Sequence, residues 1–343
     1  MTDIMSMTLP ELTDLVLSLG EKKYRARQLY DWIHRKHASS YDDMSNIPGS
    51  LKAALNEHVS FKMPGTAALQ ISGVDGTRKY LFEFADGCCA ESVWMKYRHG
   101  NAVCISSQIG CRMGCSFCAS TLLGLTRNLT AGEMLAQVYS IANDTGERVS
   151  NVVIMGTGEP LDNYDAVVRF IRMLTDGDGL NISERSVTVS TCGLVPEIRA
   201  LRDEHLMINL ALSLHAPNDA LRRQIMPIAR KYPLKSVMDA MRYYYGDGRR
   251  RLTFEYSLIR DVNDTDECAD ELSALLGGMN ALVNLIPVNP VTERAYRESR
   301  PERVLSFKKK LENSGIHVTI RREMGRDIDG ACGQLRKRFA DGG

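Results

Sequence analysis

The first 60 residues of the chain place apolar side chains at helical spacing. Residues 8–20 carry leucine or valine every three or four positions, and Gly20 follows them as a helix stop. Residues 24–36 repeat the spacing, and Pro48 opens a third pattern of the same kind. The pattern predicts a small module of three helices, to which we assign residues 1–64.

The period of the apolar pattern then changes from three or four residues to two. Apolar and polar residues alternate around two Asp-Gly pairs, at positions 75–76 and 86–87. Such alternation around Asp-Gly is typical of antiparallel hairpins. We therefore expect residues 65–99 to form a β-hairpin connector.

From about residue 100 onwards, short apolar strands alternate with amphipathic helices. The six predicted strands are 102–107, 151–155, 186–191, 207–213, 251–258 and 281–288. The clearest helical patterns between them are 131–143, 163–175, 234–245 and 265–276. Successive β-α units predict an α/β fold with a parallel sheet wrapped by helices. A doubly wound sheet and a partial barrel both fit this pattern, which we bound at residues 100–300, with 301–343 as a C-terminal segment.

Composition places the chain among ordinary globular proteins. Of its 343 residues, 44% are hydrophobic and 25% are charged, which excludes collagen-like and disordered classes. The net charge is +1, so a nucleic-acid surface has to be a local patch. Basic residues gather in the segments 22–36, 249–251 and 336–338. The sequence has neither a long apolar stretch nor a secretory signal, so we expect a cytoplasmic protein that contacts no membrane.

Three of the nine cysteines form a compact motif. Cys111, Cys115 and Cys118 are spaced C-x3-C-x2-C just after the first strand of the β-α series, and thiolates at this spacing converge on one soft metal centre. A structural zinc site and a ferredoxin-type cluster both use four protein ligands. Cys104 is a poor fourth ligand, because it lies on a predicted strand seven residues earlier. Three thiolates leave one iron of a [4Fe–4S] cluster open, as in the radical S-adenosylmethionine (SAM) enzymes that this motif resembles.

Glycines and polar residues follow several predicted strands. Gly158 and Glu159 come after the second strand of the series; glycine lets backbone approach a ligand, and the carboxylate can accept a hydrogen bond from an ammonium group. Further candidates at strand ends are Ser190, Ser213, Leu214, His215 and Asn289. Each alone is explained equally well by a turn or a helix cap. Because the C-terminal ends of barrel strands form one mouth, together they predict a ligand pocket.

At this point the chain resembles the RlmN/Cfr group of radical-SAM RNA adenosine methyltransferases. The motifs that carry the resemblance cover most of the chain: YRARQLYDWIH (24–34), AESVWMKY (90–97), CISSQIGCRMGCSFCAS (104–120), GLTRNLTAGE (124–133), MGTGEPLDNYD (155–165), STCGLVP (190–196), LSLHAP (212–217) and DIDGACGQL (327–335). The resemblance implies a partial (β/α)6 radical-SAM barrel with an N-terminal helical RNA-binding module and a C-terminal catalytic-loop extension. It also implies a [4Fe–4S] cluster on the three-cysteine motif and two SAM molecules per turnover, bound by the strand-end residues.

The resemblance further implies a methyl group carried by the protein. Cys332 in DIDGACGQL would take a methyl group from one SAM, and a radical made from the second SAM would remove a hydrogen from it. The methylene radical would add to the adenine ring. Glu91 would then accept the ring proton, and Cys104 would free the RNA by forming a disulfide with Cys332. Cys192 is the rival of Cys104, because the chemistry alone does not choose between them.

RNA is the substrate that the resemblance implies. Trp32, His34 and the arginine-rich helix around them are similar to the branch that methylates carbon 2 of an adenosine in 23S rRNA and, by the same resemblance, the adenosine 3′ of the anticodon in tRNA. Methylation of carbon 8 of the same rRNA adenosine is the alternative within the family, and a non-catalytic zinc-binding RNA module is the alternative from another class. The expected partners are 23S rRNA, tRNA and an electron donor such as flavodoxin or ferredoxin, with the enzyme itself a monomer.

Overall fold

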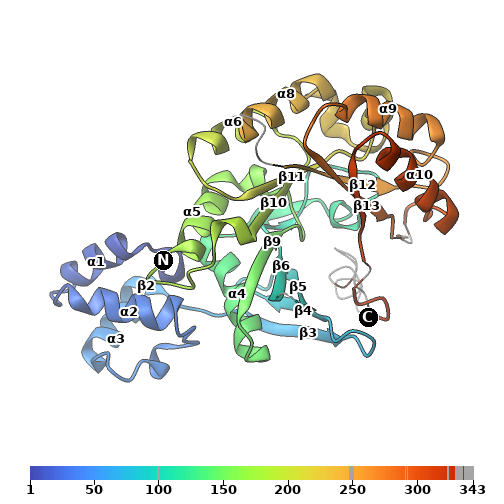
Figure 1. The fold of residues 1–343 in the computed structure, drawn as a ribbon. Coiled ribbons are helices and arrows are strands. Elements are labelled where there is room, and N and C mark those ends of the chain that lie inside the picture. Colours follow the sequence, from blue (N-terminus) through green and yellow to red (C-terminus); the bar gives the residue numbers. More distant parts are fainter. Residues whose placement is uncertain are drawn as a thin grey trace.

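A ten-stranded sheet forms the centre of the molecule. The computed structural model describes residues 1–98, 100–246, 251–289, 291, 293–322, 324–328 and 335. The strands of the sheet follow the order β14-β13-β12-β11-β10-β9-β6-β5-β4-β3. Neighbours in the sheet are therefore neighbours in the chain, apart from two short strands between β6 and β9 that form a ribbon of their own. Figure 1 shows the sheet curving through the body of the molecule, with an N-terminal helical module beside it.

The parallel part of the sheet begins at β6 (Gly100–Ile105). It continues, each strand parallel to its neighbour, through β9 (Val149–Ile154), β10 (Val187–Thr191), β11 (Asn209–Ser213), β12 (Leu252–Leu258), β13 (Ala281–Pro287) and β14 (His317–Ile320). A strand order that never reverses is that of a barrel wall, whereas a doubly wound sheet reverses at a switch point. The fold is therefore the partial barrel. The six predicted strands are confirmed, and β14 is a seventh that the apolar pattern did not predict.

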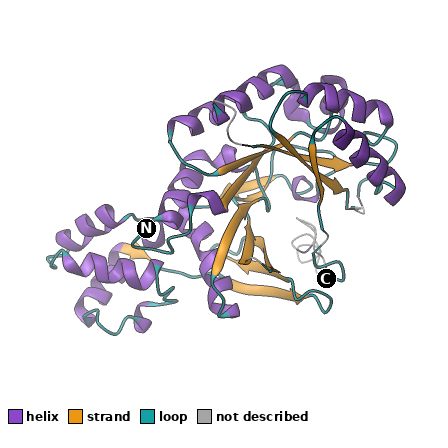
Figure 2. Cartoon of the chain, in the orientation of Figure 1, coloured by secondary structure: helices purple, strands orange, loops and turns teal. Residues whose placement is uncertain are grey.

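Helices cover the outer side of this wall (Figure 2). They are α4 (Ala131–Thr145), α5 (Tyr164–Thr175), α6 (Val195–Asp203), α7 (Asp219–Ile225), α8 (Leu234–Tyr245), α9 (Asp266–Leu276) and α10 (Pro301–Asn313). Alternate strand residues such as Val189, Leu212 and Phe254 are buried against them. The residues between these, among them Ser190 and Ser213, face the barrel interior and are only half-buried. The interior is therefore polar and open to a ligand.

Three antiparallel strands extend the sheet on the other side of β6. β3 (Gly65–Ile71), β4 (Arg78–Glu83) and β5 (Cys89–Tyr97) form two hairpins, and β5 pairs with β6. The turns lie at the two predicted Asp-Gly pairs, where Gly76 and Gly87 have φ of 73° and 78°. The predicted hairpins are confirmed, and they belong to the central sheet. The extension places β5 directly beside the first barrel strand.

Three helices form the N-terminal module, as the sequence predicts. They are α1 (Leu9–Ser18), α2 (Tyr24–His34) and α3 (Gly49–His58). α1 begins with a capping box, in which Thr8 and Glu11 each accept a hydrogen bond from the other's backbone N–H. The apolar faces of the three helices belong to the same buried cluster as the barrel core, so the module is packed onto the barrel.

Short elements complete the chain. β1 (Thr2–Asp3) pairs with β2 (Val59–Ser60), and β7 (Gln108–Gly110) pairs with β8 (Leu125–Asn128). The 3-10 helices are η1 (Ile4–Ser6), η2 (Tyr41–Asp43), η3 (Ala119–Thr121), η4 (Pro160–Asn163), η5 (Glu184–Ser186) and η6 (Pro227–Arg230). None of the helices in the described part of the chain has both the length and the apolar character that crossing a bilayer requires.

Candidate active site

The three-cysteine motif lies in the loop between β7 and β8. The N–H of Cys111 donates to the carbonyl of Gly124 at 3.0 Å, which closes the base of the loop. The N–H of Ser116 donates to the carbonyl of Ile225 at 2.9 Å, so the end of α7 holds the middle of the loop. The backbone of the motif is therefore fixed at two points by the surrounding fold.

The thiols of this loop lie close enough to act on one another electrostatically. Burial raises the pKa of Cys111 to about 12, and the charge of Cys118 contributes to the rise. Burial also raises the pKa of Cys115, and the charges of Cys118 and Cys111 add to the effect. Each thiol thus disfavours thiolate on the others. A bound metal group removes this penalty, since its positive charge deprotonates coordinating thiols.

The donor set of the loop fits an iron–sulfur cluster. Between positions 111 and 124 the sequence has no His, Asp or Glu, so the strong donors are the three soft thiolates, which fit such clusters. In the residues that the structure describes, no three His, Cys, Asp or Glu side chains converge closely enough to hold a single ion. Thiolates suit zinc as well as iron–sulfur clusters, so it is the count of three cysteines that matches a [4Fe–4S] cluster with one open iron.

Arg222, on α7, is a buried cation beside the motif. Its Nη2 donates to the carbonyl of Cys192 at 2.6 Å, and its Nε donates to the carbonyl of Leu214 at 3.2 Å. Its Nη1 is buried and has no hydrogen-bond partner among the described residues. Burial raises the pKa of Cys115, and the guanidinium charge opposes that rise. An unpaired N–H on a buried cation fits a negatively charged group held against the loop, as a thiolate-ligated cluster is.

The sequence pattern did not single out Arg222. An arginine within a predicted helix carries no sign of its burial, because the burial arises from packing of α7 beneath two strand ends.

Gly158 and Glu159 follow β9, as predicted. Glu159 lies near enough to the motif for its charge to act on Cys111 and Cys115. Gly158 has φ of 112°, and a Cβ there would meet Gln108 Cβ at 2.7 Å, so this turn requires glycine. Glu159 is buried, and its carboxylate accepts hydrogen bonds from the N–H of Cys192 at 2.8 Å and of Leu161 at 3.1 Å. Burial raises its pKa, while these two bonds lower it. The carboxylate has lone pairs left for a further donor.

The predicted residues of the next two strand ends also meet. The hydroxyls of Ser190 and Ser213 lie 3.1 Å apart in the barrel interior. His215 accepts a hydrogen bond from the N–H of Ser257 at 2.9 Å, and its ring lies 4.9 Å from that of Phe117 in the cysteine loop. Burial lowers the pKa of His215 to about 3, so its imidazole is neutral. The strand ends and the cysteine loop therefore border one region.

The two remaining predicted pocket residues differ in exposure. Leu214 is fully buried, and its N–H donates to the carbonyl of Glu255 at 3.0 Å. Asn289 follows β13 and is exposed. No contact joins Asn289 to the other predicted residues in the part of the chain that is described.

Glu91 and Cys104 face the same side of the sheet. Cys104 on β6 pairs with Val93 on β5, and Glu91 is two residues from Val93 on the same strand. Side chains two apart on a strand, and those of directly paired residues, point to one face. This surface, which lines the barrel interior, is here called the inner face. Glu91 and Cys104 are both buried there.

The described parts of the C-terminal segment pack on the inner face. Met324 contacts the apolar cluster that includes Cys104, and Leu335 is clustered with Leu81 and Cys89. Cys332, the expected methyl carrier, lies outside the described residues. Met324 and Leu335, which precede and follow position 332 in the sequence, thus both contact the face that holds Glu91 and Cys104.

Hydrogen bonds accepted by Asp327 and Asp75 join the turn between β3 and β4 to the C-terminal segment. Ser72 Oγ donates to Asp327 Oδ1 at 2.5 Å, and the N–H of Gly73 donates to Asp327 Oδ2 at 2.8 Å. In the reverse direction the N–H of Gly325 donates to Asp75 Oδ2 at 2.9 Å. Figure 1 shows the C-terminal loop beside this turn. We call these contacts the clasp; sequence analysis missed it, because its partners are some 250 residues apart.

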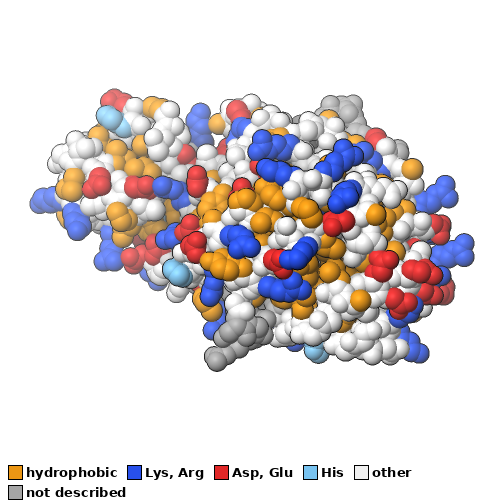
Figure 3. All heavy atoms as spheres, turned by 90° about the horizontal axis from the view of Figure 1, so that it is seen from above, with side chains coloured by type: hydrophobic (Ala, Val, Ile, Leu, Met, Phe, Trp, Pro, Cys, Tyr) orange, Lys and Arg blue, Asp and Glu red, His pale blue; other side chains and the backbone are white. Residues whose placement is uncertain are grey.

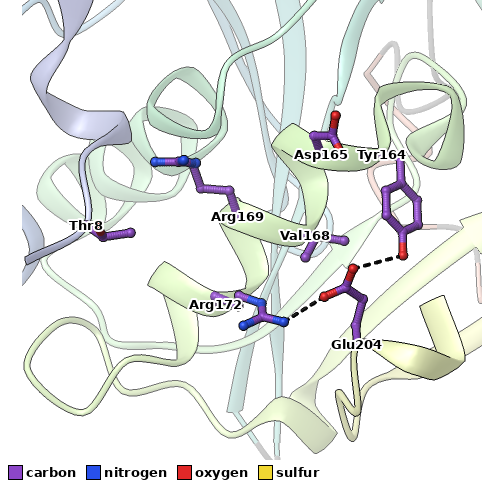
Figure 4. Close-up of a pocket in the computed structure, with 7 residues that line it drawn as sticks. All are labelled: Thr8, Tyr164, Asp165, Val168, Arg169, Arg172 and Glu204. Carbon is purple, nitrogen blue, oxygen red and sulfur yellow. Dashed lines mark hydrogen bonds and ion pairs between the residues drawn. The ribbon is translucent and has the colours of Figure 1, made fainter. Parts of the chain in front are cut away.

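A surface groove of about 280 Å³ lies apart from these residues (Figure 4). It runs along α5 and includes Thr8 of the N-terminal module. Within it Glu204 accepts hydrogen bonds from Arg172 Nη2 at 2.6 Å and from the Tyr164 hydroxyl at 3.2 Å. Glu204, Arg172 and Tyr164 are thus already paired with one another. No predicted site residue lines the groove.

Comparison with known proteins agrees with this site. Residues 105–272 match the family model of the radical SAM superfamily, and residues 2–61 match that of the ribosomal RNA large subunit methyltransferase N-terminal domain. The structure resembles a radical SAM methyltransferase from Sphaerobacter thermophilus with a TM-score of 0.93 and 43% identity, covering 97% of this chain and 99% of that one. The fold and the cysteine loop therefore define a radical SAM enzyme.

Full-length relatives give the family more narrowly. A probable dual-specificity RNA methyltransferase RlmN from Lachnospira eligens is 56% identical over 341 residues, 99% of this chain and 97% of its own. Another from Lachnoclostridium phytofermentans is 56% identical over 339 residues, 99% of this chain and 95% of its own. The chain belongs to the RlmN family.

Proposed function

We propose that this protein is a radical SAM RNA methyltransferase that methylates carbon 2 of an adenosine in 23S rRNA and the adenosine 3′ of the anticodon in tRNA. The methyl group would be carried as S-methylcysteine on Cys332. The observation that carries the proposal is the inner face, on which Glu91 and Cys104 share one side. Met324 and Leu335, from either side of the carrier position, pack there too. A base, a thiol and a carrier segment are what this chemistry needs in one place.

The residues around the cysteine loop would hold the two cofactors. Cys111, Cys115 and Cys118 would bind a [4Fe–4S] cluster, and Gly158, Glu159 and the strand-end residues would bind SAM, two molecules serving each turnover. When bound and reduced, these groups supply a carbon-centred radical. Glu159 has a buried carboxylate to receive an ammonium group, and the Ser190–Ser213 pair offers hydroxyls to a polar ligand. Neutral His215 shapes the wall between pocket and loop.

The inner face supports Cys104 over Cys192 as the resolving thiol. A disulfide requires Cα atoms about 4.4–6.8 Å apart, so the resolving thiol must share a face with the carrier segment. Cys104 packs with Met324 of that segment. Cys192 instead lies beneath a strand end, where its backbone contacts Glu159 and Arg222.

The N-terminal module would supply part of the RNA surface. The side chains of Arg27, on α2, and of Arg35, which follows the last residue of α2, are each 71% exposed. Lys36 lies 4.0 Å from the centre of the Trp32 ring. Exposed cations beside aromatic rings bind phosphates and stack on bases.

The rest of the surface supports a local RNA patch. Figure 3 shows Lys and Arg interspersed with Asp and Glu over a whole face of the molecule, in keeping with the net charge of +1. In the other two basic segments, Arg251 is exposed, whereas 249–250 and 336–338 lie outside the described residues.

The division of the chain follows from these roles. Residues 1–64 would bind RNA, 65–99 would bear the base, 100–300 would generate the radical and 301–343 would carry the methyl group. The enzyme would act as a monomer in the cytoplasm, where its RNA substrates are, and a flavodoxin or ferredoxin would reduce it.

Mass spectrometry of the modified nucleoside tests the proposal. Anaerobically reconstituted enzyme is incubated with 23S rRNA fragments, tRNA, SAM and reductant, with Cys332→Ala as the inactive control. We expect 2-methyladenosine from the wild type and none from the control. The 8-methyl isomer would instead place the enzyme in the carbon-8 branch. An iron- and sulfide-loaded protein that makes no methyladenosine would overturn the proposal, and a protein that retains zinc in place of iron would indicate the RNA-binding module.

A further inference from the structure

Lys79 and Glu91 form an ion pair that is closed off from solvent. The Lys79 Nζ lies 3.0 Å from Glu91 Oε2, and the two side chains are 0% and 3% exposed. Lysine is almost never buried without a partner, because an ammonium group loses its hydration there. A lysine at this position therefore needs a reason beyond packing.

The pair lies in the middle of the inner face. Lys79 pairs directly with Val93, and Val93 pairs with Cys104, so the three form one row across β4, β5 and β6. Glu91 is diagonal to Lys79, opposite Leu81. Lys79 is thus the first member of the row that ends in Cys104, and its ammonium group reaches diagonally to the Glu91 carboxylate.

Apolar side chains lie next to Glu91 on the inner face. Its strand neighbour on this face, Cys89, is clustered with Leu81 and with Leu335 of the C-terminal segment. Its backbone carbonyl accepts a hydrogen bond from Ser106 Oγ at 2.7 Å, which fixes the strand but does not reach the carboxylate. The ion pair with Lys79 therefore fixes where the Glu91 carboxylate lies on this face.

We propose that Lys79 is a positioning residue for Glu91, which holds the carboxylate and orients it toward the ring carbon of the substrate adenine. The inference rests on the proposed function, in which Glu91 accepts the ring proton. In that step the carbon–hydrogen bond breaks, its electron pair stays with the ring, and the proton moves to Glu91 as a neutral carboxylic acid. Lys79 keeps its three protons, and no electron is exchanged.

Four variants test the inference. Lys79→Met removes the charge, Lys79→Arg keeps it, and Glu91→Gln removes the base. Lys96→Met is the matched control. Lys96 is on β5, the strand of Glu91, and its Nζ lies 2.7 Å from the Glu147 carboxylate, but its side chain is 57% exposed. Each protein is given substrate RNA, SAM and reductant, and protein–RNA crosslink and methyladenosine are measured over time. Mass measurement of methyl loading on Cys332 and thermal melting report on the earlier step and on folding.

We expect Lys79→Met to load its methyl group normally and to accumulate crosslink as Glu91→Gln does. General bases contribute typically about 100- to 10,000-fold, and we expect a slowing of at least about 10-fold in Lys79→Met. Lys79→Arg should recover most of the rate, and Lys96→Met should match the wild type. RNA deuterated at carbon 2 should slow Lys79→Met more than the wild type, since proton removal becomes rate-limiting. A merely structural lysine would not change this isotope effect.

The outcomes separate the inference from the proposed function. If Glu91→Gln accumulates crosslink but Lys79→Met resolves it at the wild-type rate, the role of Lys79 is wrong and that of Glu91 stands. If neither accumulates crosslink, the base itself is misassigned. If Lys79→Met does not fold, Lys79→Arg decides. A folded Lys79→Arg protein that resolves the crosslink as slowly as Glu91→Gln overturns the inference. A Lys79→Arg protein with a recovered rate and the isotope effect of the wild type upholds it.

Discussion

At the scale of single residues, the cysteine loop offers the simplest test. With Cys115 replaced by alanine, two thiolates remain in a loop that has no His, Asp or Glu, and two thiolates do not hold a four-iron cluster. We expect Cys115→Ala to bind less than about a tenth of the wild-type iron, measured as iron and sulfide per chain after anaerobic reconstitution. Cys268→Ala, which alters a buried cysteine on α9, is the control. Full iron content in Cys115→Ala would disprove the ligand assignment.

The role proposed for Cys104 is tested by its own variant. In that proposal, a protein without this thiol still loads its methyl group and adds it to the ring, but cannot form the disulfide that frees the RNA. We expect Cys104→Ala to trap protein joined to RNA, seen as a slow band on a denaturing gel that nuclease removes. Cys192→Ala is the comparison, because that thiol is buried away from the C-terminal segment. If Cys192→Ala traps RNA and Cys104→Ala turns over, the two assignments must be exchanged.

The sequence predicts where residues lie along the elements better than it predicts which side chains are buried. The positions of Gly158, Glu159 and Ser190 at strand ends follow from the β-α pattern, and the structure has them there. The alternation in β4 instead suggests that Lys79 points to solvent, because its neighbours Tyr80 and Phe82 form the apolar face. The structure buries both faces of β4, since the C-terminal segment covers the second one, and no local pattern reports that cover.

At the scale of elements, the clasp joins the β3–β4 turn to residues 325 and 327 of the C-terminal segment. The Ser72 hydroxyl lowers the pKa of Asp327, so the carboxylate is the form that holds the turn. Asp327→Asn keeps the size but leaves one neutral acceptor oxygen and replaces the other oxygen with an NH2 donor, so the hydrogen bonds from Ser72 and Gly73 weaken. We expect faster proteolytic cleavage after residue 320 and slower methyl transfer, measured in parallel. Ser72→Ala should give a smaller effect in the same direction.

A result for Asp327→Asn with normal cleavage and normal transfer would show that the clasp is dispensable. Asp178→Asn is a suitable control, because Asp178 is an exposed acid that accepts a hydrogen bond from Arg27 of α2, and Figure 1 shows α2 at the opposite end of the molecule from this turn. It should change neither measurement.

Element prediction succeeded where apolar periods are long and failed where strands are short. The helices expected at 131–143 and 234–245 are α4 and α8, within two residues at each end. β14 has four residues, of which one is buried, and this is too short for an apolar period to be recognised. It forms a strand because it pairs in parallel with the edge of β13. The ribbon of β7 and β8 was likewise too short to predict.

At the scale of the whole molecule, two histidines join the N-terminal module to the barrel. His34 Nδ1 lies 2.9 Å from the hydroxyl of Tyr139 on α4, and the ring of His37 stacks on the same tyrosine at 4.7 Å. Burial lowers the pKa of His34 to about 3 and lowers that of His37 as well. Because these values lie below the usual 6.5, the stabilising effect is complete above about pH 6.5 and is lost as the pH falls toward 3.

This linkage predicts a loss of stability in mild acid. Between pH 7 and 5.5 we expect the free energy of unfolding to fall by about 1 kcal/mol for His34, with His37 adding to it. Urea denaturation at the two pH values measures the fall. His34→Asn should reduce it, whereas His58→Asn, at the exposed end of α3, should leave it unchanged. Equal pH dependence in His34→Asn and the wild type would contradict the linkage.

The pairing of β5 with β6 has a consequence for how such an enzyme diverges. The cysteine loop and the strand-end residues belong to the parallel wall, whereas Glu91, Lys79 and the clasp turn belong to strands added beyond its first member. An ancestral barrel can therefore acquire a new reaction by growth at a free sheet edge, with its inherited interior left intact. In the described chain the outermost strands are β3 and β14. Insertions that distinguish distant descendants of this architecture should accumulate at those two borders, and lineages that lose β3 to β5 should keep radical formation while losing methyl transfer.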